Sequence, residues 1–358
     1  MPFENKDEST VNKKQRLNLS KSAKEVLEYD KYCFGAETDS GLINTIFKNY
    51  APDADASVAL RLNEFKGALQ DRLGAMKGID IEVKKRIITS LGTEKEKELK
   101  ERIKKHGKGE SLTFSLNDYN WKYLMETGEC QEQKYYSRRG EYIKEVIEEY
   151  ASLPYVQRER IYLKDTVNMI ETAIENKRQL KIETENGELF SVYPYMIMQN
   201  SLSTVNYLVC YQKKYDHTDD EKSPGSFRLL AIKNVRIEKS KSAFLNKKDK
   251  EILQKAVDKR GAQSQFMASE EISAEVKFTE KGLEMYKRVV FNRPMYSERL
   301  NDNTFRFICS FNQAEYYFFK FGEEAEAISP PELRNRLEEK YEKALKRYKR
   351  KDVSDDRG

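Results

Sequence analysis

Tyrosines and cations occur together in the middle of this 358-residue chain, between residues 193 and 236. Tyrosine rings can stack on unpaired nucleobases, at roughly 1–3 kcal/mol per base, and lysine and arginine can contact the intervening phosphates. Arginine can also form two parallel hydrogen bonds to one phosphate, which lysine cannot. We therefore predict that single-stranded nucleic acid is bound by Tyr193, Tyr195, Tyr207, Lys213, Lys214, Arg228, Lys233 and Arg236.

A second interpretation of these residues is that they are structural. Tyr207 shares a strand face with Val205 and Val209, which is the pattern of core residues. Lys213 and Lys214 begin a polar loop, where lysines are often only solvated. Both interpretations are open at the level of the sequence.

The segment from Leu180 to Ile237 must position these side chains, and its pattern predicts four or five short strands. Apolar or β-branched residues at positions 180, 182 and 184 alternate with charged ones, and Asn186-Gly187 follows them. This dipeptide, flanked by alternation, is the strongest short hairpin signal, because both central residues of the turn need positive φ. Several short strands joined by tight turns indicate a small barrel.

The N-terminal part of the chain shows one strand followed by two helices, and it does so twice. Alternation at residues 15–20 and 112–116 predicts the strands, and Ser20 or Ser22 can cap the first helix. Tyr50 and Tyr150 fall at matching ends of the two copies, which indicates an internal repeat. Between the copies, residues 57–76 and 82–105 are expected to be helical.

One strand followed by two helices resembles the ribbon-helix-helix fold of DNA-binding repressors. That fold needs two copies, because a lone strand leaves its edges unpaired. In the family, outward strand residues enter the major groove, and the matching residues here are Lys14, Arg16 and Asn18. The second copy has uncharged serine and threonine at these places, and Glu37 and Asp39 flank the helix start where phosphate would bind. DNA reading and a purely structural pairing are both open, as is pairing within or between chains.

The last part of the chain alternates short strands and helices. We expect strands at residues 272–278, 304–310 and 325–328, and helices at 280–290 and 313–321, before a final helix. This order indicates a small ferredoxin-like α+β unit. The final helix carries an apolar stripe that includes Leu333, Leu337 and Tyr341, and this stripe can pack on its own sheet or form a dimer contact.

The middle segment resembles the WYL domain, an Sm-like or SH3-like barrel of prokaryotic regulators. The family's Pro-aromatic pair, Trp-Tyr-Leu strand and Arg-containing strand are matched in order by Pro194-Tyr195, Asn206-Tyr207-Leu208 and Phe227-Arg228-Leu229. Tyr195 and Arg228 are therefore the strongest candidates to line a ligand surface. The family tryptophan is replaced by Asn206, and a second expected arginine by Ala231. The extension that follows the barrel in this family often forms oligomers, so the resemblance also implies a homodimer.

The order of the modules resembles the WYL-domain accessory proteins of type VI-D CRISPR systems. The resemblance implies that the chain binds single-stranded RNA and stimulates the RNA-guided ribonuclease of such a system. The main alternative is a ribbon-helix-helix transcription regulator that binds DNA and senses a ligand through its WYL domain. A third hypothesis is an interaction scaffold without nucleic-acid affinity.

Composition and residue spacing limit the other functions. The net charge is only +5 although 35% of the residues are charged, so any nucleic-acid surface must be a local cluster. The four cysteines and two histidines lack metal-binding or catalytic spacing, so we expect no enzymatic activity, no metal and no cofactor. No apolar run is long enough to cross a membrane, which predicts a soluble cytoplasmic protein.

The predicted architecture is a multidomain α+β protein, and a chain of this length suits two to four domains. We expect a disordered tail at residues 1–13, a ribbon-helix-helix-like module at 14–155 and a WYL barrel with a leading helix at 156–246. A linker helix is expected at 247–272, a ferredoxin-like dimerisation extension at 273–350 and a second tail at 351–358.

Overall fold

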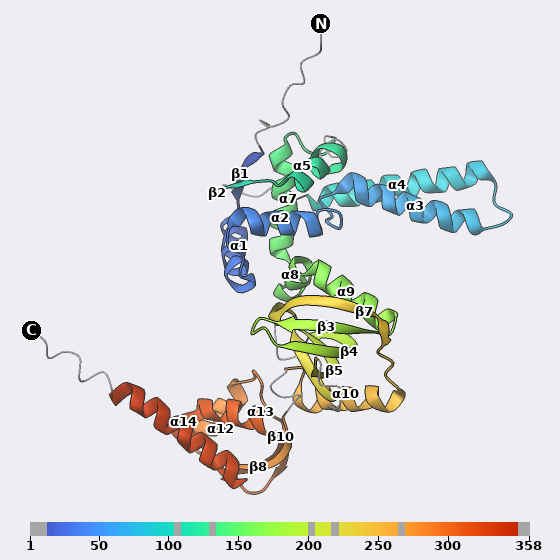
Figure 1. The fold of residues 1–358 in the computed structure, drawn as a ribbon. Coiled ribbons are helices and arrows are strands. Elements are labelled where there is room, and N and C mark those ends of the chain that lie inside the picture. The colour runs from blue at the N-terminus through green and yellow to red at the C-terminus, as the bar shows by residue number, and fades with distance from the viewer. Residues whose placement is uncertain are drawn as a thin grey trace, which may run out of the picture. The chain divides into compact units, whose positions relative to one another are not determined.

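The computed structural model describes residues 13–103, 109–128, 134–199, 205–215, 222–263 and 269–349 (Figure 1). The chain divides into two compact units, Met1–Lys164 and Asp165–Gly358. Both units contain helices and antiparallel strands, as expected for an α+β protein. Apart from Lys13, the tails predicted at residues 1–13 and 351–358 lie outside the described residues.

The first unit contains the two predicted copies of a strand followed by helices. The first copy is β1 (Lys14–Leu19), α1 (Lys21–Phe34) and α2 (Asp39–Tyr50); the second is β2 (Glu110–Ser115), α5 (Asp118–Tyr123), the π-helical turn η2 (Leu124–Gly128) and α7 (Arg139–Ser152). The backbone N–H of Ala23 donates to Ser20 Oγ at 3.2 Å, so Ser20, not Ser22, caps α1. Gly35 ends α1 with a φ of 67°, a left-handed conformation that glycine adopts without strain.

Strands β1 and β2 pair with each other inside one chain, in antiparallel register with Arg16 opposite Thr113. Their inward side chains, Leu17, Leu19, Phe114 and Leu116, are buried. Helices α2 and α7 pack together through the rings of Phe47 and Tyr142, whose centroids lie 6.0 Å apart, edge to face. The two copies thus bury one common core, and the pairing is within the chain.

A buried ion pair joins α1 to α8 (Tyr155–Tyr162). Arg158 donates from Nε and Nη2 to the two carboxylate oxygens of Asp30, at 2.7 and 2.9 Å. The Tyr150 hydroxyl donates to the same carboxylate at 2.8 Å, and burial together with the Asp30 charge raises the pKa of Tyr150. Because Asp30 is fully buried, its charge depends on these partners for compensation.

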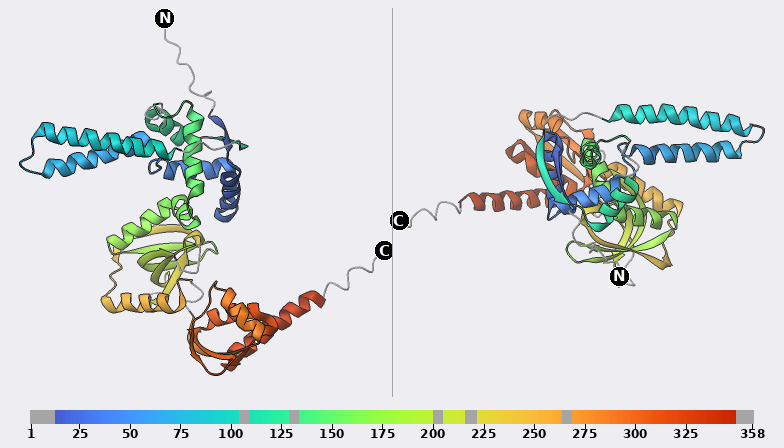
Figure 2. Two further views of the ribbon diagram at one scale, coloured as in Figure 1. Left: turned by 180° about the vertical axis from the view of Figure 1, so that it is seen from behind. Right: turned by 90° about the horizontal axis from the view of Figure 1, so that it is seen from above.

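Two long helices, α3 (Val58–Ala75) and α4 (Ile81–Arg102), separate the two copies along the chain. They lie side by side as an antiparallel hairpin (Figures 1 and 2). The predicted helices at residues 57–76 and 82–105 correspond to α3 and α4, although α4 ends at Arg102, and residues 104 and 105 lie outside the described part of the chain.

The second unit opens with most of α9 (Lys164–Glu175) and a five-stranded antiparallel sheet. The strands are β3 (Arg178–Thr184), β4 (Leu189–Gln199), β5 (Asn206–Lys214), β6 (Ser223–Arg228) and, after the 3-10 turn η3 (Leu229–Ala231), β7 (Ile232–Ser242), in the order β6-β5-β4-β3-β7. The β3–β4 hairpin turns at Asn186-Gly187 as predicted, but only Gly187 has a positive φ, of 79°. A three-residue loop closed by a 2.9 Å bond from the Thr184 N–H to the Glu188 carbonyl replaces the expected two-residue turn.

The five strands do not close into the barrel that the sequence predicted. Among the described residues, the edge strands β6 and β7 pair only with β5 and β3. The helix α10 (Lys247–Arg260) packs on the sheet instead, and Leu253 is buried against Tyr207 and Val209. After α10, the carbonyl of Ala262 accepts a hydrogen bond from Ser226 Oγ on β6. One face of the sheet is therefore covered by a helix, and its edges are not joined by strand pairing.

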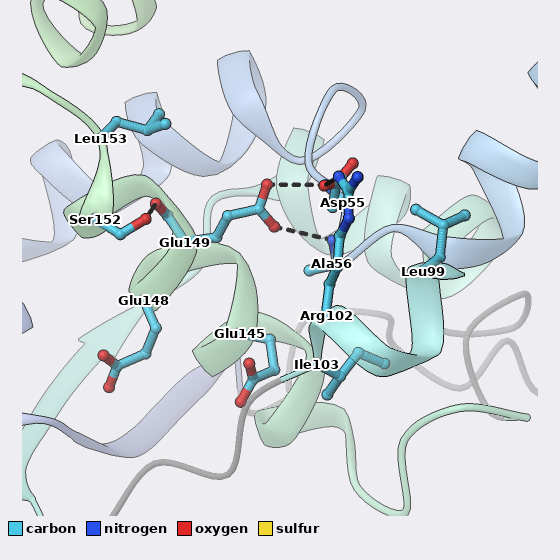
Figure 3. A pocket seen from close by; sticks show the side chains of 10 residues that line it. All are labelled: Asp55, Ala56, Leu99, Arg102, Ile103, Glu145, Glu148, Glu149, Ser152 and Leu153. Carbon is cyan, nitrogen blue, oxygen red and sulfur yellow. Dashed lines mark hydrogen bonds and ion pairs between the residues drawn. The ribbon is translucent and has the colours of Figure 1, made fainter. Parts of the chain in front are cut away.

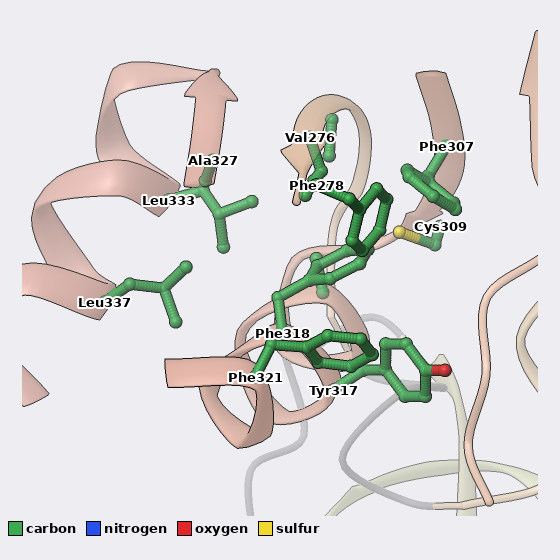
Figure 4. Packing of buried hydrophobic residues seen from close by; sticks show 12 residues of the cluster. Val276, Phe278, Phe307, Cys309, Tyr317, Phe318, Phe321, Ala327, Leu333 and Leu337 are labelled. Atoms are coloured by element: carbon green, nitrogen blue, oxygen red, sulfur yellow. The ribbon is translucent and has the colours of Figure 1, made fainter. Parts of the chain in front are cut away.

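The C-terminal part of the second unit is a four-stranded antiparallel sheet with three helices. The elements are β8 (Glu271–Phe278), α12 (Glu280–Arg288), β9 (Tyr296–Arg299), β10 (Thr304–Ser310), α13 (Phe311–Phe318), the 3-10 turn η4 (Phe319–Glu324), β11 (Ala325–Ser329) and α14 (Pro331–Lys349), with strand order β11-β8-β10-β9. Phe278, Phe318 and Phe321 meet in its core (Figure 4). Strand β9 was not predicted, because all four of its residues are exposed and show no apolar alternation.

Candidate nucleic-acid interface

Three cations from three strands lie in one cross-strand row of the five-stranded sheet. Arg236 on β7 is opposite Lys181 on β3. Lys181 is opposite Ser191 on β4, which in turn is opposite Lys213 on β5. Directly opposed residues of antiparallel strands point to the same face. The row therefore aligns positive charge across four neighbouring strands.

Tyr215 follows β5 and lies beside this row. The Nζ atom of Lys181 is 3.6 Å from the centre of its ring, and that of Lys241 is 5.4 Å away. The face of an aromatic ring is negative, so it attracts each ammonium group by about 0.5–1 kcal/mol at an exposed site. We name these five residues, Lys181, Lys213, Tyr215, Arg236 and Lys241, the Lys181 patch.

The carboxylates near the Lys181 patch neutralise it only in part. Glu183 accepts a hydrogen bond from Asn234 at 2.7 Å and lies 3.4 Å from Lys233, and these two contacts lower the pKa of Glu183. Glu238 lies 3.9 Å from Lys241. Within the described part of the chain, Lys181, Lys213 and Arg236 form no ion pair. These three cations are therefore available to an anionic ligand.

Helix α10 covers the neighbouring part of the same face. Tyr207 is 7% exposed and packs in a cluster with Tyr211 and Leu253. Burial also raises the pKa of Tyr211. A base could reach the ring of Tyr207 only if α10 moved away. For Tyr207, the structure therefore favours the core interpretation over the predicted stacking role.

Two of the predicted lysines form ion pairs with carboxylates. Lys214 is opposite Phe190, on the other face of the sheet from Lys213, and its Nζ lies 3.7 Å from Glu188. Lys233 is exposed and forms the 3.4 Å pair with Glu183. Exposed ion pairs of this kind are weak, so they compete only slightly with a phosphate.

Tyr193, Tyr195 and Arg228 complete the predicted set. Tyr193 is half-buried, with Lys222 Nζ 5.5 Å from the centre of its ring. Tyr195 is half-buried beside the α10 cluster, where the pairing of β4 with β5 shifts register. Arg228 is exposed at the end of β6 and forms no ion pair with any described residue. Its guanidinium group is therefore accessible.

The β1–β2 ribbon carries the residues predicted to contact DNA. Lys14, Arg16 and Asn18 are all exposed on β1. Arg16 Nε donates to Ser111 Oγ of the paired strand at 2.7 Å. At the start of α2, Asp39 forms a 2.7 Å ion pair with Lys31, which partly offsets its negative charge.

A pocket of about 390 Å³ in the first unit has the opposite charge (Figure 3). Four carboxylates and one arginine are among its lining residues: Asp55, Glu145, Glu148, Glu149 and Arg102. The Glu149 carboxylate accepts the backbone N–H groups of Asp55 and Ala56, each at 2.9 Å. Glu148 accepts from both the N–H and the hydroxyl of Ser20 at 2.6 Å. These acids hold the fold together, and their charge repels a polyanion.

The described residues contain neither a metal site nor a membrane span. No group of three or more His, Cys, Asp or Glu side chains in this part of the chain could hold a metal ion. None of its helices has the length and apolar character to cross a membrane.

Sequence reasoning missed Lys181 and Lys241. The alternation of residues 180, 182 and 184 already pointed Lys181 away from the core. Only the register of β3 against β4 and β7 shows that it lies between Arg236 and Lys213. Lys241 lies within an irregularity in the β3–β7 pairing, which no residue pattern indicates.

Comparison with known proteins shows a shared fold. No protein-family model matches the chain, and no curated protein matches it. The crystal structure of a CRISPR Cas-related protein aligns with a TM-score of 0.71 and 22% sequence identity, over 98% of each chain. Proteasome accessory factor B/C of Arthrobacter aurescens aligns over 90% of this chain and 58% of its own, at 13% identity. Its TM-score of 0.26 is too low to indicate a shared fold.

Proposed function

We propose that this protein is a single-stranded RNA-binding accessory protein of a type VI-D CRISPR system, and that it stimulates the RNA-guided ribonuclease of that system. The Lys181 patch is the observation on which the proposal rests. It combines three cations without ion pairs to described residues and one ring flanked by lysines. Such a combination binds flexible polynucleotide through phosphate contacts and base stacking.

The geometry of the patch favours a single strand over a duplex. Neighbouring strands lie about 4.8 Å apart, so Arg236, Lys181 and Lys213 span about 14 Å across the sheet. Tyr215 lies against this row, and an aromatic ring can stack only on a base that is not paired. A duplex would offer phosphates to the lysines but no open base face to the ring.

The module order supports the CRISPR assignment. The paired strands β1 and β2, each followed by helices, fit a ribbon-helix-helix-like module. The β-α-β-β-α-β order of the last sheet fits a ferredoxin-like extension. The full-length likeness to a CRISPR Cas-related protein adds support for a role beside a CRISPR ribonuclease. We include no catalytic role for the chain in this proposal.

The decisive experiment compares two ligands of equal length. We expect an unstructured 20-nucleotide RNA to bind more tightly than a 20-base-pair DNA at 150 mM salt, measured by fluorescence anisotropy. The affinity for RNA should fall steeply with salt, because phosphate contacts release counterions. Target cleavage by the ribonuclease should also be faster with the protein present. Equal or weaker RNA binding would overturn the proposal.

A DNA-binding regulator is the second candidate, because the β1–β2 ribbon exposes Lys14, Arg16 and Asn18 on one strand. Arginine and asparagine can read base edges in the major groove. This candidate predicts selective binding to a palindromic duplex over a scrambled duplex of the same composition. Equal binding to both duplexes would remove it.

We also propose that the protein is a homodimer through its C-terminal part. Leu345 and Tyr348 on α14 are exposed, as is Ile328 on the edge strand β11. Leu345 and Tyr348 lie near the end of an apolar stripe whose first members, Leu333 and Leu337, are buried in the sheet core. Light scattering should give twice the chain mass of 42.1 kDa, and Leu345→Glu with Tyr348→Glu should reduce it to one chain mass.

A further inference from the structure

A second pocket, in the second unit, has the chemical composition of a nucleotide site. It has a volume of about 420 Å³ and is lined by residues from the end of α9, from β4 and from the segment that leads into α10. Three lysines are among its lining residues, Lys177, Lys247 and Lys250, and no carboxylate is. The rings of Phe244 and Tyr195 form part of its apolar wall. We name it the Phe244 pocket.

The ring of Phe244 is open to solvent. Its side chain is 63% exposed. The Nζ atom of Lys177 lies 5.8 Å from the centre of its ring. An exposed ring with an ammonium group beside it repeats the arrangement of Lys181 and Tyr215, and it suits the stacking of a base next to its phosphate.

Lys177 has a strained backbone. Its φ is 52°, in the left-handed region where a lysine is disfavoured and a glycine is not. Among the described residues, neither Lys177 nor Lys250 forms an ion pair. Lys247 forms a 3.9 Å pair with Glu251 between two exposed side chains. The three lysines can therefore turn towards phosphate at little cost.

The pocket is continuous with the Lys181 patch along the chain. Lys177 precedes Lys181 by four residues, and Phe244 follows Lys241 by three. At 3.3 Å per extended residue, these separations are about 13 Å and 10 Å. The two segments are also adjacent in space, since the Ala243 N–H donates to the Lys177 carbonyl at 2.9 Å. A strand of RNA on the patch can therefore extend into the pocket.

We propose that the Phe244 pocket binds one unpaired nucleobase of the RNA strand that crosses the Lys181 patch. This inference rests on the proposed function. The base stacks on Phe244 beside Tyr195, and the phosphates on either side of it contact Lys177 and Lys250, with Lys247 nearby. The described residues that line the pocket include no carboxylate, so the charged side chains closest to the anionic backbone are lysines.

The test uses the full chain and a fluorescein-labelled 20-nucleotide oligouridine, with affinity measured by anisotropy. Phe244→Ala should weaken binding by about fivefold or more, the loss expected for one stacked base. Phe291→Ala is the matched control, because Phe291 is also exposed, at 45%, with Lys320 Nζ 5.3 Å from its ring centre. This control should change the affinity by less than about twofold.

Lys177→Gly separates the ligand role from the structural role. Glycine suits the left-handed backbone, so the melting temperature should not fall. Removal of one phosphate contact should lower the slope of log K against log salt by about 0.7. Cross-linking of 4-thiouridine in the same RNA should mark the peptide that contains Phe244.

The outcomes distinguish the inference from the proposed function. If the wild-type chain does not bind oligouridine, both are wrong. If it binds, but Phe244→Ala keeps its affinity or Lys177→Gly keeps its salt slope, only the pocket inference is overturned. Reduced binding by both variants at unchanged melting temperatures supports it.

Discussion

The β1–β2 ribbon and the Lys181 patch both present cations on antiparallel strands, but they suit different ligands. On the ribbon, the cations come from β1 alone, and the facing residues of β2 are serine and threonine. The only ring of the two strands, that of Phe114, is buried. The patch draws its cations from three strands and adds a half-buried ring. Positive charge is common to both, and the ring is what favours an unpaired strand.

The pockets of the two units extend this comparison. The pocket of the first unit is lined by four carboxylates, and two of these, Glu148 and Glu149, accept backbone N–H groups of other segments. The Phe244 pocket is lined by three lysines and no acid. Their volumes are similar, about 390 and 420 Å³, so charge and not size decides which one can receive a polyanion.

The largest predicted effect tests whether the RNA site needs the first unit. Arg158→Ala leaves Asp30 buried without its ion-pair partner, so the free energy of unfolding of the first unit should fall by about 3–5 kcal/mol. Calorimetry should show one transition moving to lower temperature while a second stays in place. RNA affinity, measured between the two transitions, should stay near the wild-type value.

Arg86→Ala, on the exposed surface of α4, is the control and should shift neither transition measurably. If Arg158→Ala abolishes RNA binding at a temperature where the second unit is still folded, the RNA interface belongs to the first unit and not to the Lys181 patch.

A smaller but more specific effect is expected from reversing the charge of the row. Lys181→Glu, Lys213→Glu and Arg236→Glu together should weaken RNA binding by about a hundredfold and lower the salt slope by about 2, since three cations no longer contact phosphate. The control reverses Lys21, Lys97 and Lys343, which are exposed and each form an i,i+4 ion pair on their own helix. Equal losses in the two triple variants would mean that net charge, and not the row, binds RNA.

The sequence predicted the strands better than the surface they make. Alternation and the Asn186-Gly187 turn located the β3–β4 hairpin, because these signals are local. The barrel prediction failed because local patterns do not say whether β6 and β7 meet, and α10 covers the sheet face instead. The same helix explains why Tyr207 is buried. The alternation of Tyr207 with valines fits both a core residue and a residue that stacks on a base. Only the packing of α10 distinguishes the two.

Only some of the cations of the site were predicted, again because local patterns do not show which strands pair. Lys213 and Arg236 were chosen because they fall within residues 193–236, where tyrosines and cations occur together, whereas Lys181 lies before that stretch. Register brings the three together, and two of the three pairings that set it join residues more than 20 positions apart. Residue type therefore predicts candidate contacts, and tertiary pairing determines which of them can act together.

A moderate effect is expected at the ring of the patch. Tyr215→Ala removes a stacking surface, so RNA affinity should fall by about fivefold, and Tyr215→Phe should keep it within about twofold. The melting temperature of both variants should stay close to wild type, because the ring is only half-buried. If phenylalanine and alanine weaken binding equally, the hydroxyl group matters and the stacking model is wrong.

The smallest effect on RNA is expected at the ribbon, and this prediction separates the two candidate functions. Arg16→Ala with Asn18→Ala removes side chains that are exposed on β1, together with the exposed 2.7 Å hydrogen bond from Arg16 to Ser111. Stability should therefore change by less than about 0.5 kcal/mol. RNA affinity should change by less than about twofold, because these residues lie outside the patch. If the ribbon reads DNA, the same variant should lose its preference for a palindromic duplex, so one protein preparation measured against both ligands assigns each surface to its own nucleic acid.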